Sequence, residues 1–170
     1  GGYQGPVKIG NAQAEQRDFD AVRGIVTAEM FAFIEATQPE AWERLTKLHG
    51  GNPDTAQAKL ADRVVKVLDQ RGTIEVLRRG VDDFGVNIRL AYFAPANDLN
   101  QHTVARYGAN RLTVTRQLPF EPGSNKTLDL CLFVNGLPVA TVELKNHLTG
   151  QTANNAIGQY QQRDPHNVTL

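Results

Sequence analysis

The sequence carries no excess of charge of either sign. Its 18 Lys and Arg residues balance 18 Asp and Glu residues, so the formal net charge is zero. Any binding of DNA must therefore come from a local basic patch or from other parts of a larger protein, not from bulk attraction. The chain also has only one cysteine, Cys131, which excludes an internal disulfide and fits a reducing, cytoplasmic setting.

Several familiar motifs are missing as well. No apolar run is long enough to span a membrane and no signal-peptide pattern is present, so we expect no membrane partner. The sequence has no GxxxxGK[ST] loop, which excludes a recognisable ATP site in this chain. It has no GxSxG, HExxH or CxxC, which argues against serine hydrolases, zincins and zinc ribbons.

The remaining composition is that of an ordinary globular domain. A chain of 170 residues with 41% hydrophobic and 21% charged residues can bury one sizeable core. Its periodicity predicts, in order, helices, a strand at 85–93, a helix, a strand at 111–117, a hairpin and a last helix. We expect an α/β fold with a central mixed β-sheet flanked by helices. A loop segment is predicted for residues 1–19 and a single domain for 20–170.

The hairpin is the most informative stretch. Residues 127–145, TLDLCLFVNGLPVATVELK, are predicted to form two strands joined at Asn135-Gly136. Because side chains alternate along a strand, each strand has one wholly apolar face. The other face carries three ionisable residues, which are Asp129, Glu143 and Lys145. Burying unpaired charge is costly, so these residues in such apolar strands indicate a function.

The register of the hairpin decides whether the two acids meet. An uninterrupted two-residue turn would place Asp129 opposite Val142 and set each apolar face against a polar one. A shift by one residue aligns the apolar faces and brings Asp129 opposite Glu143. We therefore predict one extra residue, either in a three-residue loop or in a bulge near Leu137-Pro138, where proline cannot donate to the sheet.

These three residues fit a particular chemistry. Adjacent carboxylates repel unless a proton or a cation lies between them, and carboxylate oxygens suit Mg²⁺, so Asp129 and Glu143 are candidate metal ligands. Lys145 faces the same way and can orient or deprotonate a water on the metal, or stabilise a phosphate anion. The set predicts metal-assisted phosphodiester hydrolysis. The alternative is a solvated edge face with an ordinary Glu–Lys pair.

The same residues resemble a known nuclease signature. Asp129 together with the ELK run at 143–145 is similar to the PD-(D/E)xK motif. The longer run VNGLPVATVELKNHLTGQTANNAIGQYQQRDP resembles the N-terminal nuclease domain of the R (HsdR-type) subunit of type I restriction enzymes. The resemblance continues upstream through IRLAYFAPANDLN and YGANRLTVTRQLPF and covers roughly residues 20–165.

The resemblance implies a restriction-endonuclease-like core, truncated at both ends, in a fragment of a larger subunit. It implies that Gln159 joins Asp129, Glu143 and Lys145 in the catalytic set. The family often has a tyrosine four residues after this glutamine, where this chain has Arg163. Candidate DNA-backbone contacts are Arg163 and the basic residues that precede the hairpin, which are Arg106, Arg111 and Arg116.

The function that the resemblance implies is a Mg²⁺-dependent endonuclease domain. It would hydrolyse DNA after ATP-driven translocation by a motor outside this chain, so ATP is expected only for the full-length subunit. The implied partners are double-stranded DNA and the methylation and specificity subunits of a restriction complex. Two alternatives stay open: a standalone nuclease of the same superfamily, and an inactive DNA-binding or subunit-docking module.

Overall fold

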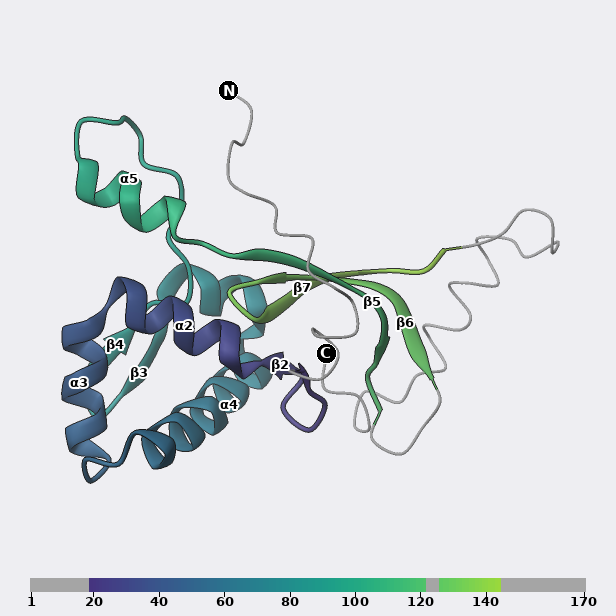
Figure 1. Cartoon of the computed structure of the whole chain (residues 1–170), viewed down its shortest axis with the longest axis horizontal. Coiled ribbons are helices and arrows are strands. Elements are labelled where there is room, and N and C mark those ends of the chain that lie inside the picture. The colour runs from purple at the N-terminus through teal and green to yellow at the C-terminus, as the bar shows by residue number, and fades with distance from the viewer. Residues whose placement is uncertain (1–18, 122–125, 145–170) are drawn as a thin grey trace, which may run out of the picture.

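The computed structural model describes residues 19–121 and 126–144. In Figure 1, three helices surround a small strand pair, and a curved three-stranded sheet extends away from this helical part. The elements in chain order are β1 (Phe19–Asp20), β2 (Ile25–Val26), α2 (Thr27–Thr37), α3 (Pro39–Leu48), α4 (Pro53–Arg79), β3 (Val81–Asp83), β4 (Val86–Ile88), α5 (Gln101–Gly108), β5 (Leu112–Pro119), β6 (Thr127–Val134) and β7 (Leu137–Val142).

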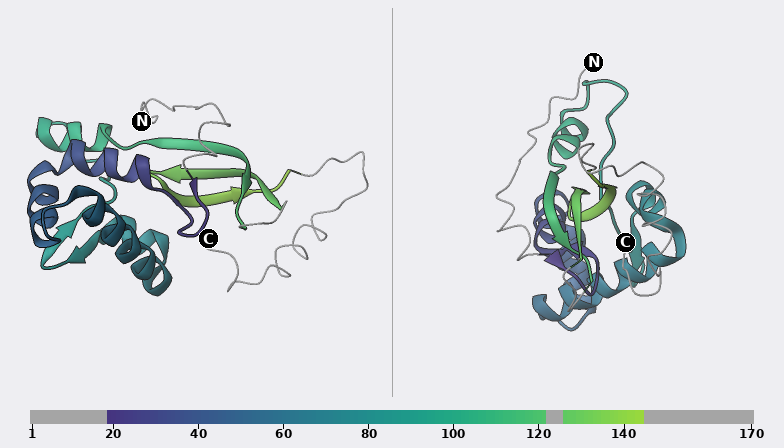
Figure 2. Two further views of the ribbon diagram at one scale, coloured as in Figure 1. Left: turned by 60° about the horizontal axis from the view of Figure 1, so that its bottom comes forward. Right: turned by 90° about the vertical axis from the view of Figure 1, so that its right-hand side faces the viewer.

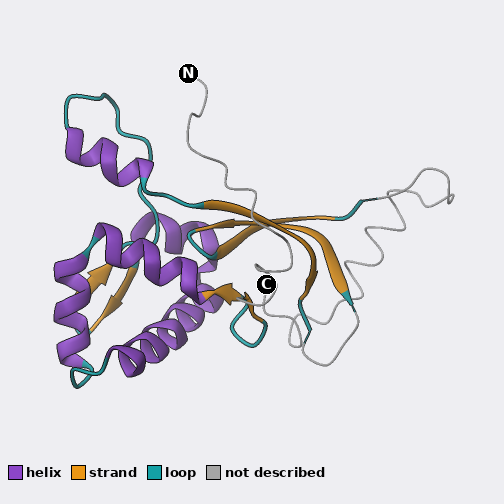
Figure 3. Cartoon of the chain, viewed as in Figure 1, coloured by secondary structure: helices purple, strands orange, loops and turns teal. Residues whose placement is uncertain are grey.

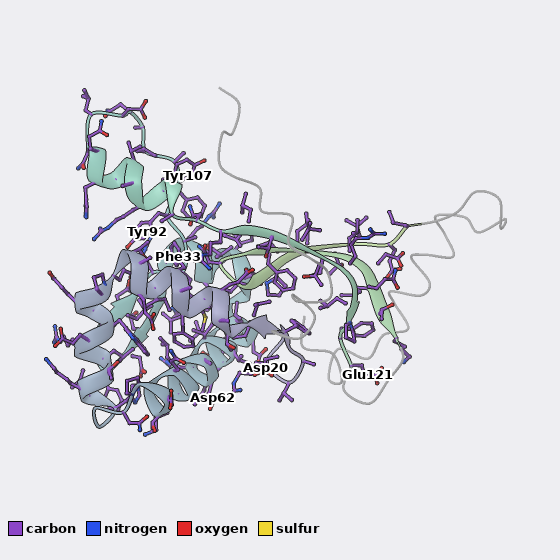
Figure 4. The ribbon with its side chains drawn as sticks, viewed as in Figure 1. Asp20, Phe33, Asp62, Tyr92, Tyr107 and Glu121 are labelled. Carbon is purple, nitrogen blue, oxygen red and sulfur yellow. The ribbon has the colours of Figure 1, made fainter. Side chains whose placement is uncertain are left out.

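The helical part buries apolar side chains that recur three and four positions apart, as the sequence pattern predicts. One core cluster joins α2, α3 and α4 to the β3–β4 pair. Figure 4 shows Phe33 beside Tyr92, and their ring centroids are 5.9 Å apart. The fully buried helical residues of this cluster include Met30, Phe33, Ile34, Leu45, Leu60 and Val64.

Helix α4 bends at a glycine. Gly72 has φ 75° and ψ 160°, outside the helical region, and glycine adopts such angles without a Cβ penalty. The bend separates a long first segment from a short second one that ends before Gly80. The strand predicted at 85–93 is shorter than expected, because a tight turn at Phe84-Gly85 folds β3 back against β4.

The expectation of one central mixed sheet is wrong for the described residues. Their strands form three separate sheets, β1–β2, β3–β4 and β5–β6–β7, and every pairing is antiparallel. Figure 3 shows the strands in these separate groups rather than in one layer. Short connections explain the result, since strands joined by tight turns pair antiparallel whereas parallel pairs need a long crossover. The coarser expectation of an α/β fold is confirmed.

The hairpin has the predicted register. Val134 pairs with Leu137 across a two-residue turn, but further out Leu132 pairs with Ala140 and Leu130 with Val142. The register shifts between Leu132 and Phe133, so Val139 is the extra residue of a bulge. The three-residue loop is excluded. Continued one position beyond the last pair, the same register sets Asp129 opposite Glu143, the residue that follows β7.

Around Leu132, the buried face of the hairpin is not the face that carries the leucines of β6. Cys131 and Phe133 are buried on the sheet face that alternation assigns to Asp129, whereas Leu132 is 40% exposed. Phe133 packs edge-on against Phe19, with ring centroids 6.1 Å apart. A second core cluster therefore lies between the sheet and the β1–β2 segment.

Candidate functional site

The candidate site lies at the end of the sheet that points away from the helices. Figures 1 and 2 show the β6–β7 turn against the helical part and the opposite strand ends projecting outward. Asp129 is near the outer end of β6, which is the middle strand. Arg116 pairs with Leu130 and Leu118 with Leu128, so Gln117 stands opposite Asp129 on β5. The site thus forms a row of Gln117 on β5, Asp129 on β6 and, by continuation of the register, Glu143 directly after β7.

Two hydrogen bonds hold the carboxylate of Asp129. The backbone N–H of Leu144 donates to Oδ2 at 2.6 Å. The side-chain amide Nε2 of Gln117 donates to Oδ1 at 3.1 Å. A carboxylate has about four lone-pair sites, so each oxygen keeps acceptor capacity for a further partner. Asp129 and Glu143 are both half-buried, which leaves them in reach of solvent and of a ligand.

The donor set fits a hard cation with a water-rich shell. Among residues 19–121 and 126–144, no group of three or more His, Cys, Asp or Glu side chains is placed to hold a metal. Mg²⁺ needs fewer protein ligands than that, since it is commonly bound through one or two carboxylates and keeps several waters. The pair Asp129 and Glu143 therefore meets the requirement of Mg²⁺ but not that of a structural zinc site.

The turn of the hairpin anchors the site to the helical part. Asn135 is fully buried and its side-chain amide donates to the carbonyl of Leu90 at 2.8 Å. Its Oδ1 accepts from the backbone N–H of Arg111 at 2.7 Å. The carbonyl of Gly136 accepts from the N–H of Val26 at 2.8 Å. These bonds fix the turn, so the strand ends that carry the acids project from a rigid base.

A cluster of charges stabilises the β1–β2 segment next to the sheet. Arg23 bridges Asp20 and Asp62, with nitrogen–oxygen distances of 2.7 Å to each, and Figure 4 shows the two acids near one another. Partial burial alone would raise the pKa of Asp20. The hydrogen bonds and charge of Arg23 outweigh it, so the pKa lies below its ordinary value of 3.8. The same contacts raise the pKa of Arg23.

Comparison with known families decides the identity of the chain. The family model for the N terminus of the type I restriction enzyme R protein matches residues 14–168. The chain belongs to this family. Comparisons with curated proteins and with solved structures find no match. The family makes the chain the N-terminal region of a type I restriction enzyme R subunit, as the motif resemblance predicts.

Three residues that this R-subunit family implies for the site lie outside the described residues. They are Lys145, Gln159 and Arg163. Their assignment, including the replacement of the family's tyrosine by Arg163, remains a prediction from sequence. The described site therefore consists of Asp129 and Glu143, to which the structure adds Gln117. The sequence alone does not single out Gln117, because a glutamine among the polar residues of a strand is common.

The two basic candidates on β5 occupy different places in the R-subunit domain. Arg116 is exposed and adjacent to Gln117, near the acids. Arg111 is exposed at the opposite end, where its backbone contacts Asn135. Six residues of extended strand separate Arg111 from Gln117, which corresponds to roughly 20 Å. Arg116 is thus near Asp129 along the sheet, and Arg111 is not.

A separate cavity of about 700 Å³ lies between the α2–α3 junction and α5. Its lining includes Gln38, Glu40, His102 and Arg106, with Arg106 placed 5.3 Å from the ring centroid of Tyr92. It contains one acid rather than a pair, so it lacks the donor set expected for a nuclease site. Arg106, one of the predicted backbone contacts, belongs to this cavity. Among the described residues, no helix is long and apolar enough to cross a membrane.

Proposed function

We propose that this chain is the Mg²⁺-dependent endonuclease domain of a type I restriction enzyme R subunit. It hydrolyses phosphodiester bonds of double-stranded DNA after translocation driven by an ATP-dependent motor elsewhere in the subunit. Its partners are the methylation and specificity subunits, which supply the choice of recognition sequence. The proposal extends family membership to a specific reaction at a specific site.

One observation carries the proposal. The bulge at Val139 shifts the register by one residue, and this register, continued one position beyond the last pair of Leu130 with Val142, sets Asp129 opposite Glu143. Two neighbouring carboxylates repel without a cation, so their placement favours metal binding over a purely structural role. An ordinary solvated strand would not require an irregularity that brings two acids together. The spacing also matches the motif by which the chain resembles PD-(D/E)xK nucleases.

Each residue of the site has a distinct part in the proposed reaction. When bound, Mg²⁺ supplies Lewis-acid charge that stabilises the attacked phosphate. Asp129 and Glu143 provide its carboxylate ligands, and the N–H of Leu144 keeps the Asp129 carboxylate in place. We assign Lys145 to the orientation of the attacking water and to the charge that develops on the phosphate. Gln159 completes the set, and Arg116 contacts the DNA backbone.

The test uses the whole R subunit assembled with its partner subunits. Asp129→Ala, Glu143→Ala and Lys145→Ala are each expected to reduce cleavage of a plasmid by roughly 100-fold or more, because contacts made in the transition state are lost. Thermal melting and ATP hydrolysis should stay near the unmodified values. Asp98→Asn and Lys47→Ala are matched controls, since both side chains are exposed and lie outside the hairpin.

The outcomes separate the alternatives. Loss of cleavage with normal ATP hydrolysis in all three variants, but not in the controls, supports the nuclease assignment. Cleavage retained within a few-fold in all three variants would show that the strand pair is ordinary sheet. Absence of cleavage by the unmodified complex in Mg²⁺, with intact DNA binding, would instead favour the inactive DNA-binding module.

A further inference from the structure

A strained residue stands directly opposite the first acid. Gln117 has φ 51°, in the left-handed region that residues with side chains seldom adopt. It lies within β5, where its neighbours Arg116 and Leu118 pair regularly with β6. A strand does not require this conformation, and glycine would adopt it without penalty. Such strain persists only where surrounding structure enforces it, and it is often found at functional sites.

The strained backbone is associated with a specific side-chain contact. The Nε2 group of Gln117 donates to Oδ1 of Asp129 at 3.1 Å. On the other side of the amide, the hydroxyl of Thr127 donates to Oε1 of Gln117 at 2.9 Å. Because an ionised carboxylate only accepts hydrogen bonds, the NH₂ end of the amide must face Asp129, and the Thr127 hydroxyl then donates to the remaining oxygen, Oε1. Thr127 thus supports the side of the glutamine amide that faces away from the acid.

Stability alone gives little reason for this arrangement. Gln117 is exposed, and its hydrogen bonds to Asp129 and Thr127 are exposed to solvent. Exposed hydrogen bonds contribute little net free energy, because water competes for the same groups. The effect that remains is geometric: Gln117 and the N–H of Leu144 hold opposite oxygens of one carboxylate. Together they restrict rotation of the Asp129 side chain.

We propose that Gln117, supported by a hydrogen bond from Thr127, is a positioning residue that holds the Asp129 carboxylate in the orientation needed to bind the divalent cation. The proposal rests on the proposed nuclease function. It adds a group from a third strand that neither the motif nor the family match assigns. Partners of this kind orient a ligand without touching the metal, and their loss typically weakens metal affinity by about 10- to 100-fold.

The decisive variant is Gln117→Gly, because it separates the backbone conformation of residue 117 from the contact that the side-chain amide makes with Asp129. Glycine suits the left-handed backbone, so the melting temperature should stay the same or rise. The amide is removed, so the dissociation constant for Mn²⁺ should rise by about 10- to 100-fold. The melting temperature and the dissociation constant for Mn²⁺ are both measured on the whole R subunit with its partners. Electron paramagnetic resonance follows the Mn²⁺ titration, and ATP is left out so that no metal bound to nucleotide contributes. Half-maximal DNA cleavage should then require correspondingly more Mg²⁺.

Three further variants complete the design. Thr127→Val removes the hydroxyl that supports the amide oxygen of Gln117 and should weaken Mn²⁺ binding, whereas Thr127→Ser keeps a hydroxyl and should bind Mn²⁺ as the unmodified protein does. Gln101→Ala is the matched glutamine control, since its exposed amide, at the start of α5, donates to the carbonyl of Asp98 and lies outside the hairpin. Asp129→Ala in the same titration reports whether the metal site exists at all.

The results distinguish this proposal from the proposed function. If Asp129→Ala abolishes Mn²⁺ binding and Gln117→Gly leaves it unchanged, the nuclease site stands and the role of Gln117 is overturned. If Asp129→Ala has no effect, both proposals fail. A fall in melting temperature in Gln117→Gly with unchanged Mn²⁺ affinity would show a purely structural role. Weakened Mn²⁺ binding without loss of thermal stability is the result that the proposal expects.

Discussion

The backbone N–H of Leu144 donates a 2.6 Å hydrogen bond to Oδ2 of Asp129. This contact joins the segment directly after β7 to β6, beyond the last regular pair, Leu130 with Val142. It shows that the two strands stay together at the outer end, where the acids lie. The bulge at Val139 determines which residue of β7 reaches this position, so a single extra residue links the hairpin register to the chemistry.

The close contact between the hairpin turn and Val26 predicts that Gly136 does not tolerate a side chain. Gly136 has φ 80°, and a Cβ added there would lie 2.2 Å from the carbonyl oxygen of Val26. Gly136→Ala combines backbone strain with a clash against main chain. It should lower the free energy of unfolding by roughly 3 kcal/mol, as measured by denaturant unfolding.

Gly85→Ala is the matched control for this prediction. Gly85 has a similar φ of 74°, but nothing lies within 4 Å of an added Cβ. Its cost should be strain alone, about 1 kcal/mol. Equal losses in the two variants would show that docking of the turn against Val26 contributes nothing.

The single cysteine reports on opening of the central strand. Burial raises the pKa of the Cys131 thiol from an ordinary 9.0 to about 12. At pH 8 the thiolate fraction is therefore about 1,000-fold lower than for an ordinary thiol, and the side chain is also inaccessible. Iodoacetamide should modify the denatured chain rapidly and the native chain only through opening of the sheet. Rapid modification of the native chain would contradict the burial of β6.

The Arg23 cluster predicts a particular acid dependence of stability. The pKa of Asp20 is lowered in the folded state, so its charged form stabilises the fold above the ordinary value of 3.8. This contribution is lost as the pH falls below 3.8 through the folded-state pKa. Asp20→Asn should destabilise the protein by about 1 kcal/mol at neutral pH. The difference from the unmodified protein should close in acid.

Thermal melting between pH 2 and pH 7 checks this prediction. Asp62→Asn is the control, because the Asp62 side chain is 66% exposed and should contribute less. A difference between Asp20→Asn and the unmodified protein that persists undiminished at pH 2 would assign the effect to packing rather than to charge.

The register of the hairpin could be predicted from the sequence, because it depends on the alternation of side chains along a strand and on the missing N–H of proline. The one-residue shift of the hairpin register followed from the need to align two apolar faces, and the ladder confirms this shift up to the pair of Leu130 with Val142. The sequence did not show that the Asn135-Gly136 turn is buried. Turns are usually on the surface, and only tertiary contacts with Val26 and Leu90 reveal the docking.

Two other features were beyond sequence reasoning for physical reasons. The left-handed conformation of Gln117 has no signature in residue type, because glutamine does not favour it. The single mixed sheet was expected from the order of the predicted helices and strands, which does not show how short connections enforce antiparallel pairing. The chemistry of Lys145 and Gln159 was inferred from motif alone and stays a prediction.

The central claim is that Asp129 and Glu143 together hold a divalent metal at the outer end of the hairpin. Anomalous diffraction from crystals of the whole R subunit soaked in Mn²⁺ tests it directly. The account predicts an anomalous peak in contact with both carboxylates, and its absence when Asp129 is replaced by Ala. A Mn²⁺-soaked crystal with no peak at this pair, and with the two carboxylates turned apart, would contradict it.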